Sequence, residues 1–296
     1  MSPAAPELGA VLTAMVTPFD ADGAVREDAT RRLARHLVEH GSDGVVVAGT
    51  TGEAPTLDDA EKLRVMEIVV DEIGDSATVV AGTGSNDTAH SVKLTRDASR
   101  LGVDAVLVVT PYYNKPNRRG LVAHFTAVAA ATDLPVLLYN IPARCVINLE
   151  PDLLAELGRT DNIVGVKQAN SDLKQARQLV EAGLAVYAGD DNLLGPFAEI
   201  GGAGGICVSS HLVGEQMKEL YEAARAGDVE RSRAIDRELA DVYRTLFITP
   251  APATVKAALE MLGLEAGGVR LPLVEVDDSE RAEVRRMVES LRPVPA

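Results

Sequence analysis

The stretch Ile163-Val164-Gly165-Val166-Lys167 is a short apolar run that ends in a lysine. Continuous apolar residues, rather than alternating ones, are typical of a strand that is buried on both faces of a parallel sheet. Burial disfavours the charged ammonium, so more of such a lysine is the free amine that attacks carbonyl carbons. Taken alone, the run favours a simpler alternative, in which the lysine ends a strand and extends its charged end to solvent.

The same pattern recurs along the chain. Short apolar and β-branched runs, each long enough for one strand, alternate with longer amphipathic stretches that have helical periodicity. The predicted strands are Val11–Val16, Gly44–Ala48, Thr78–Ala81, Ala105–Val109, Val136–Tyr139, Ile163–Val166, Ala185–Tyr187 and Gly205–Val208.

The intervening stretches have the start signals of helices. Asp58 and Asp87, for example, each precede an amphipathic stretch, and aspartate is a favoured N-cap residue. The predicted helices between the strands include Asp28–Glu39, Asp59–Ile73, Thr88–Arg100, Arg119–Ala131 and Ser171–Ala182.

Eight strand and helix units in about 200 residues predict an α/β fold, specifically a (β/α)8 TIM barrel. The alternative is a doubly wound open sheet, which usually has fewer strands and a glycine-rich nucleotide turn after its first strand. Here the first predicted strand is followed by Thr17-Pro18-Phe19-Asp20, which is not such a turn.

After His211 the pattern is helical to the end of the chain. We therefore predict a catalytic barrel over residues 1–226 and a C-terminal helical region over residues 227–296. The first of the helices completes the barrel and the other three form the appendage. These helices are Leu212–Ala226, Asp228–Thr245, Pro252–Leu262 and Ser279–Leu291.

The composition argues against several classes of function. A formal net charge of −15 opposes binding to nucleic acid or to an acidic membrane. No apolar run approaches the roughly 18 residues of a membrane span, and the first residues lack the pattern of a secretory signal. Cys145 and Cys207 stand outside any CxxC pair, so we expect neither a disulfide framework nor a zinc site. A reducing, cytoplasmic location fits this cysteine usage.

In a barrel of this kind, active sites lie where the strands end at the C-terminal mouth. Lys167 follows the sixth predicted strand and Tyr139 ends the fifth, while Thr50 and Tyr113 follow the second and fourth. Schiff-base formation and the loss of water that follows need a group that passes protons back and forth. Tyr139 is well placed for that task, and Thr50 and Tyr113 could extend the relay. The convergence favours Lys167 as a Schiff-base nucleophile.

Structural explanations remain open for the individual residues. Tyr139 could simply close the core at a strand end, and Thr50 and Thr51 could bond within their own tight turn. Arg144 could be a surface residue in a loop instead of a bidentate grip on a carboxylate. The turn at residues 49–53 lacks the spacing of a phosphate-binding loop. His36 and His40 are spaced i, i+4, but on a helix predicted to lie outside the barrel and without a carboxylate ligand pattern, so we predict no metal site.

Four motifs also occur in a definite order and spacing: Gly49-Thr50-Thr51-Gly52-Glu53, Pro111-Tyr112-Tyr113-Asn114-Lys115-Pro116, Tyr139-Asn140-Ile141-Pro142 and Val164-Gly165-Val166-Lys167. In this order they resemble the dihydrodipicolinate synthases, within the wider family of pyruvate-dependent class I aldolases that includes N-acetylneuraminate lyase. The resemblance covers nearly the whole chain, and it agrees with the predicted barrel with C-terminal helices.

The resemblance implies an activity. It is the condensation of pyruvate with L-aspartate 4-semialdehyde, which begins lysine and diaminopimelate biosynthesis. Lys167 would form the Schiff base, Tyr139 would shuttle protons, and Thr50 would link Tyr139 to Tyr113 from a neighbouring subunit. The family usually forms homotetramers of two tight dimers, and it uses neither a metal nor an organic cofactor.

The resemblance also implies how the substrates are held. Thr51 would bind the pyruvate carboxylate and the backbone of Ile206 would line the pyruvate pocket. Arg144 would hold the carboxylate of aspartate semialdehyde, with Gly189 near that substrate.

Arg144 separates the synthases from the sugar-acid lyases of the family, which generally lack an arginine two positions after the proline of the YNxP motif. The chain departs from the usual synthase pattern at Cys145, normally threonine, and at Gln168, often glutamate. The alternatives are therefore a pyruvate-dependent aldolase or lyase for a sugar acid or another 2-oxo acid, and a sensor that has kept the fold without catalysis. The intact set Lys167, Tyr139, Thr50 and Tyr113 disfavours the sensor.

The sequence further predicts weak or absent feedback inhibition by lysine. Asp59 and Lys62 occupy positions where lysine-sensitive bacterial relatives have histidines, and His90 replaces a glutamate, although Asn86 and Tyr112 are retained. An inhibition curve with free lysine checks this prediction. A half-inhibition below about millimolar lysine would contradict it.

Overall fold

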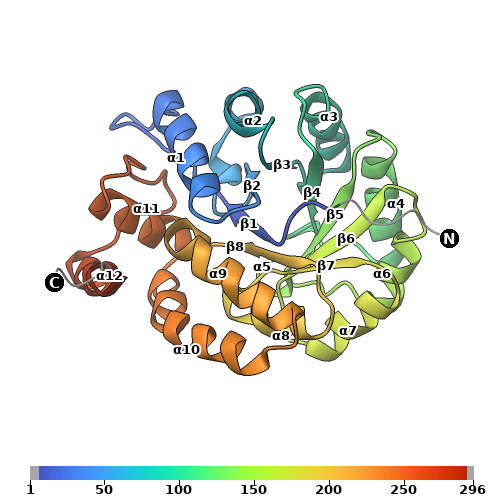
Figure 1. The fold of residues 1–296 in the computed structure, drawn as a ribbon. Coiled ribbons are helices and arrows are strands. Elements are labelled where there is room, and N and C mark those ends of the chain that lie inside the picture. The colour runs from blue at the N-terminus through green and yellow to red at the C-terminus, as the bar shows by residue number, and fades with distance from the viewer. Residues whose placement is uncertain (1–6, 292–296) are drawn as a thin grey trace.

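The computed structural model describes residues 7–291, which form a closed barrel of eight parallel strands surrounded by helices (Figure 1). The last five residues of the predicted C-terminal region, 292–296, lie outside the described part. The strands follow one another around the barrel in chain order, and β8 closes it by pairing with β1. The predicted (β/α)8 TIM barrel is confirmed.

The strands are short and lie close to their predicted positions. Their bounds are β1 (Val11–Ala14), β2 (Gly44–Val47), β3 (Thr78–Gly82), β4 (Ala105–Val109), β5 (Val136–Asn140), β6 (Ile163–Gln168), β7 (Ala185–Ala188) and β8 (Gly204–Cys207).

Helices follow the strands along the chain. Their bounds are α1 (Glu27–Glu39), α2 (Asp59–Ile73), α3 (Thr88–Ala98), α4 (Arg118–Ala129), α5 (Pro142–Cys145), α6 (Pro151–Leu157), α7 (Leu173–Glu181), α8 (Leu194–Glu199), α9 (Ser210–Arg225), α10 (Val229–Leu246), α11 (Ala251–Met261) and α12 (Asp278–Leu291). Two 3-10 turns, η1 (Ala54–Thr56) and η2 (Asp191–Leu193), follow β2 and β7.

The strands are continuously apolar because they are buried on both faces. All residues of β1, β2, β5 and β8 are buried, because their inward side chains fill the barrel and their outward ones pack under the helices. The apolar side chains of the strands and of the covering helices join in one core. None of the helices within residues 7–291 is long and apolar enough to cross a membrane.

The predicted boundary at residue 226 lies in the turn between α9 and α10. α10 packs along α9 and α8, and α11 contacts α9, so the C-terminal helices lie against one side of the barrel (Figure 1). The three short helices α5, α6 and α8 lie in stretches for which no helix bounds are predicted from the sequence.

The predicted caps at Asp58 and Asp87 are both present. The Asp58 carboxylate accepts a hydrogen bond from the Glu61 backbone N–H at 2.8 Å, and the Glu61 carboxylate accepts one from the Asp58 N–H at 3.0 Å. This reciprocal capping box starts α2, which follows the turn after β2. Asp87 similarly accepts from the N–H of Ala89 at 2.9 Å.

Replacing Asp58 by Ala removes an N-cap acceptor and one half of the capping box. We expect the free energy of unfolding to fall by about 1 kcal/mol in urea titrations. The exposed Asp75→Ala is the matched control and should change it by less than about 0.5 kcal/mol. Equal stabilities for the two variants would show that the box does not stabilise α2.

Candidate active site

Lys167 and Tyr139 lie side by side at the C-terminal ends of neighbouring strands. The two residues are direct partners in the β5–β6 register, and each is only 6% exposed. The Lys167 Nζ lies 4.6 Å from the centroid of the Tyr139 ring. Directly paired residues on adjacent parallel strands point to the same face of the sheet, which here brings an amine against a phenol. The alternative of a lysine extended to solvent is thereby excluded.

A cavity of about 650 Å³ opens at this end of the barrel. Thr50, Tyr139 and Arg144 line it, so three of the residues predicted from the sequence share one space. Among the described residues, the lining includes neither Lys167 nor Thr51. Lys167 adjoins this space through its contact with Tyr139, which lines it.

The turn that follows β2 places Thr50 and Thr51. Ala48 and Glu53, at its two ends, both have left-handed backbones, with φ of 52° and 56°. Such conformations are costly for residues other than glycine and persist where the surroundings fix them. The Thr17 hydroxyl donates to the Gly52 carbonyl at 2.7 Å, which ties the turn to the segment that follows β1.

The close approach of β3 also shapes this turn. A Cβ added to Gly82 would lie 2.3 Å from the carbonyl oxygen of Ala48. Only glycine therefore allows the end of β3 to pack against the start of the turn.

The strands on the other side of the mouth position Gly189 and Ile206. The Gly189 N–H donates to the Gln168 carbonyl at 2.9 Å, and Ile206 is fully buried in β8. Asp191, for which no role was predicted, is 2% exposed and accepts from the backbone N–H groups of Val208 and Ser209. Its carboxylate therefore fixes the loop that leaves β8.

Tyr113 lies apart from Tyr139 within this chain. It is 90% exposed and has a left-handed backbone with φ of 71°, and Lys115 is left-handed as well. The side-chain amide of Asn114 donates to the Asn86 carbonyl at 2.8 Å, which anchors the loop beneath the tyrosine. One chain alone thus does not bring Tyr113 to Lys167 and Tyr139.

The two departures from the synthase pattern differ in their surroundings. Cys145 lines the cavity, where its thiol donates to the Thr110 carbonyl and burial raises its pKa to about 11. Cys145 therefore stays a protonated thiol at neutral pH and does not compete as a nucleophile. Gln168 is buried and accepts from the Asn140 amide at 3.0 Å, in a network of amides with Asn148.

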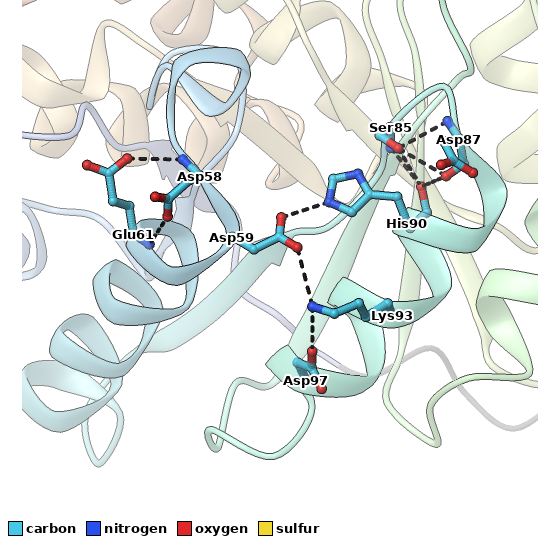
Figure 2. A network of polar contacts seen from close by, with 9 residues as sticks. Asp58, Asp59, Glu61, Ser85, Asp87, His90, Lys93 and Asp97 are labelled. Atoms are coloured by element: carbon cyan, nitrogen blue, oxygen red, sulfur yellow. Dashed lines mark hydrogen bonds and ion pairs between the residues drawn. The ribbon is translucent and has the colours of Figure 1, made fainter.

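A polar network extends from the outer end of the cavity (Figure 2). His90 Nε2 lies 2.7 Å from one carboxylate oxygen of Asp59, and Lys93 Nζ lies 3.3 Å from the other. Lys93 also bonds Asp97 at 3.2 Å. The hydrogen bond from His90, with the added effect of Lys93, holds the pKa of Asp59 below its ordinary value. Two of the positions considered for lysine inhibition thus bond each other.

One buried ion pair beside the site escaped the sequence analysis. Lys256 of α11 is 2% exposed and its Nζ lies 2.8 Å from Glu53 Oε1, at the end of the turn that carries Thr50 and Thr51. The signal in the sequence was a single lysine within the apolar stretch Ala251-Pro252-Ala253-Thr254-Val255-Lys256-Ala257-Ala258-Leu259. A charged residue in the middle of a buried helix requires a partner, but the sequence did not indicate which one.

The arrangement suits amine chemistry on a carbonyl compound. A buried amine contacts a phenol, and a threonine and an arginine, Thr50 and Arg144, line the adjoining cavity. These groups can form a Schiff base, move protons and hold a carboxylate. Among residues 7–291, no group of three His, Cys, Asp or Glu side chains is placed to hold a metal ion.

Comparison with known proteins agrees with this chemistry. Residues 7–291 match the Dihydrodipicolinate synthetase family. A 4-hydroxy-tetrahydrodipicolinate synthase from Moorella thermoacetica is 50% identical over 279 residues, 93% of this chain and 96% of that protein.

Solved structures of the same kind superpose over nearly the whole chain. A dihydrodipicolinate synthase from Bacillus anthracis has a TM-score of 0.93 at 40% identity, covering 98% of this chain and 99% of that one. A chloride-inhibited dihydrodipicolinate synthase from Acinetobacter baumannii, complexed with pyruvate, has a TM-score of 0.93 at 34% identity and covers 96% of this chain and 99% of that one.

His211, which has no role in the sequence-based predictions, joins the ends of β8 and β1. Its Nε2 accepts from the Val16 N–H at 3.2 Å, and its Nδ1 donates to the Val208 carbonyl at 2.7 Å. Burial lowers the pKa of His211 to about 4, so the ring is neutral in the folded protein at pH 7.

His211 makes the fold sensitive to acid. Between pH 6.5 and pH 4 the unfolded chain binds a proton at this histidine that the folded chain does not, so stability falls as the pH falls through this window. We expect a loss of about 3 kcal/mol from this group, measured by urea unfolding at several pH values. His211→Gln should lack this part of the loss, whereas the exposed His40→Gln should keep it. An identical pH dependence in wild type and His211→Gln would contradict the assignment.

Proposed function

This chain belongs to the Dihydrodipicolinate synthetase family, and we infer that it condenses pyruvate with L-aspartate 4-semialdehyde to give 4-hydroxy-tetrahydrodipicolinate. The reaction is the entry step of diaminopimelate and lysine biosynthesis. The observation that carries the proposal is the amine of Lys167 buried against Tyr139 at the mouth of the barrel.

Lys167 acts as the nucleophile. Its free amine attacks the ketone carbon of pyruvate, and the resulting carbinolamine loses water to form a Schiff base. Loss of a proton from the pyruvate methyl group then gives an enamine, which attacks the aldehyde carbon of the second substrate. Cyclisation through the amino group of that substrate releases the product and regenerates the lysine.

Tyr139 shuttles the protons that these steps require. It contacts the amine directly and shares the cavity with Thr50, which continues the relay. Tyr113 completes the relay from a second copy of the chain. Its exposure of 90% and the left-handed backbone of its loop support this role, because an aromatic side chain held away from its own barrel is available to a neighbouring one. The assembly is a homotetramer of two tight dimers.

The remaining site residues hold the substrates. Thr51 binds the pyruvate carboxylate, and the backbone of Ile206 lines the pyruvate pocket. Arg144, which lines the cavity, holds the carboxylate of aspartate semialdehyde, with Gly189 nearby. The reaction needs neither a metal nor an organic cofactor, because the Schiff base itself stabilises the carbanion. We propose a cytoplasmic location for this biosynthetic activity.

Replacing Arg144 by Ala tests the choice of the second substrate. Loss of the ion pair between the guanidinium and the substrate carboxylate should lower kcat/KM for aspartate semialdehyde on the order of 100-fold. This corresponds to about 3 kcal/mol of transition-state stabilisation. Trapping of pyruvate by borohydride should stay unchanged, because the Schiff base with pyruvate forms before Arg144 acts. Steady-state kinetics with both substrates measure the first effect, and mass spectrometry of the reduced protein measures the second.

Arg118→Ala is the matched control, since it removes an exposed arginine that pairs with Asp152 and Glu156 on the outside of the barrel. It should leave both readouts unchanged. If the wild type cleaves a sugar acid and does not turn over aspartate semialdehyde, the proposed substrate is wrong. If the wild type traps no pyruvate at all, the chain is a binding protein on this fold.

A further inference from the structure

The turn that carries Thr50 and Thr51 is held by residues from the far end of the chain. Glu53, the last residue of the turn, is 2% exposed, and its carboxylate is shared between two groups of the C-terminal region. Lys256 Nζ bonds Oε1 at 2.8 Å, and the backbone N–H of Arg270 donates to Oε2 at 2.9 Å. Both oxygens of a buried carboxylate are thus satisfied by donors more than 200 residues away.

Lys256 is fixed as tightly as its partner. Its ammonium also donates to the Gly268 carbonyl at 2.6 Å and lies 4.1 Å from the centroid of the Phe19 ring. Burial lowers the pKa of Lys256 to about 8, against the opposing influence of the Glu53 carboxylate. Besides Glu53, the charged group that acts on this ammonium is the guanidinium of Arg270. The ammonium therefore stays predominantly charged at neutral pH.

Arg270 also bonds residues that follow Glu53 in the chain. Its guanidinium donates to the Thr56 carbonyl at 2.6 Å and pairs with both carboxylate oxygens of Glu61. Glu61 also completes the capping box of α2 with Asp58 (Figure 2). The chain from Glu53 to Glu61 is thus held at three points by one C-terminal segment.

The left-handed backbone of Glu53 makes these contacts from Lys256 and Arg270 necessary. A residue other than glycine keeps such a conformation only where its surroundings over-determine it. Without Lys256 the Glu53 carboxylate would be buried without its counter-ion, a costly state that is relieved when the carboxylate moves to solvent. That movement would rotate Glu53 and displace Thr50 and Thr51.

We propose that Lys256 and Glu53 are positioning residues, which hold the Thr50-Thr51 turn in the geometry that binds the carboxylate of pyruvate. The inference rests on the proposed function, since it concerns how the same site holds its first substrate. It gives the C-terminal helices a part in catalysis without contact between them and the substrate.

Lys256→Met tests the role, because it keeps the length of the side chain and removes the charge. We expect the KM for pyruvate, and the pyruvate concentration that gives half-maximal borohydride trapping, to rise on the order of tenfold. The KM for aspartate semialdehyde should change by less than about twofold, because Arg144 lies on α5 at the end of another strand. A loss of fold stability alone would reduce the amount of active protein and leave both KM values unchanged.

Glu53→Gln gives a second route to the same result if Lys256→Met folds poorly. It keeps the shape of the side chain, and it should raise the KM for pyruvate in the same direction. In the double variant the two effects should be smaller than their product, because each single change breaks the same pair.

Lys218→Met is the matched control. Lys218 Nζ bonds Asp43 at 2.6 Å, between α9 and the loop before β2, at the opposite rim of the barrel from the mouth. Its loss should leave the KM for pyruvate unchanged. An unchanged KM and half-saturation for pyruvate in Lys256→Met and Glu53→Gln would overturn the inference while the proposed function stands. A wild type that forms no pyruvate adduct would overturn the proposed function itself, and the positioning role with it.

Discussion

The contact between the Lys167 amine and the Tyr139 ring is the interaction on which the site depends. It follows from strand pairing, because the parallel register of β5 and β6 sets the two residues directly opposite each other. A closed barrel has no free edge at which this register could slip, and its packed interior keeps both side chains from water. The backbone therefore places the amine and the phenol side by side, as the proposed roles of nucleophile and proton carrier require.

The barrel does not complete the site by itself. The turn after β2 contains two left-handed residues other than glycine, and its last residue is held by Lys256 and Arg270 from the C-terminal region. The C-terminal helices are thus more than a cover for the outside of α9. They supply the counter-ion for the buried carboxylate of Glu53, at the end of the turn that carries Thr50 and Thr51. In the assembly that we propose, the 90% exposed Tyr113 extends the same principle to a second copy of the chain.

The features that could be predicted from the sequence are those that depend on a local pattern of residues. Continuous apolar runs located all eight strands, and the order of the strand ends put Lys167 beside Tyr139. The Asp58 and Asp87 caps followed from the residue type and its place before an amphipathic stretch, because an N-cap bonds within its own first turn. Contacts between residues far apart in the sequence were not predicted. Neither the partner of Lys256 nor the role of Asp191 is indicated by the residues around it. The burial of His211 was also hidden, because a histidine after a strand reads the same whether its ring faces solvent or the core.

Peptide mapping after treatment with pyruvate and borohydride tests the central claim most directly. Borohydride reduces a Schiff base to a stable secondary amine, so the modified residue can be located by mass spectrometry. The account predicts one reduced pyruvate adduct per chain, on the peptide that contains Lys167, and none in Lys167→Ala. An adduct on Lys256 or on a surface lysine, with Lys167 unmodified, would contradict it.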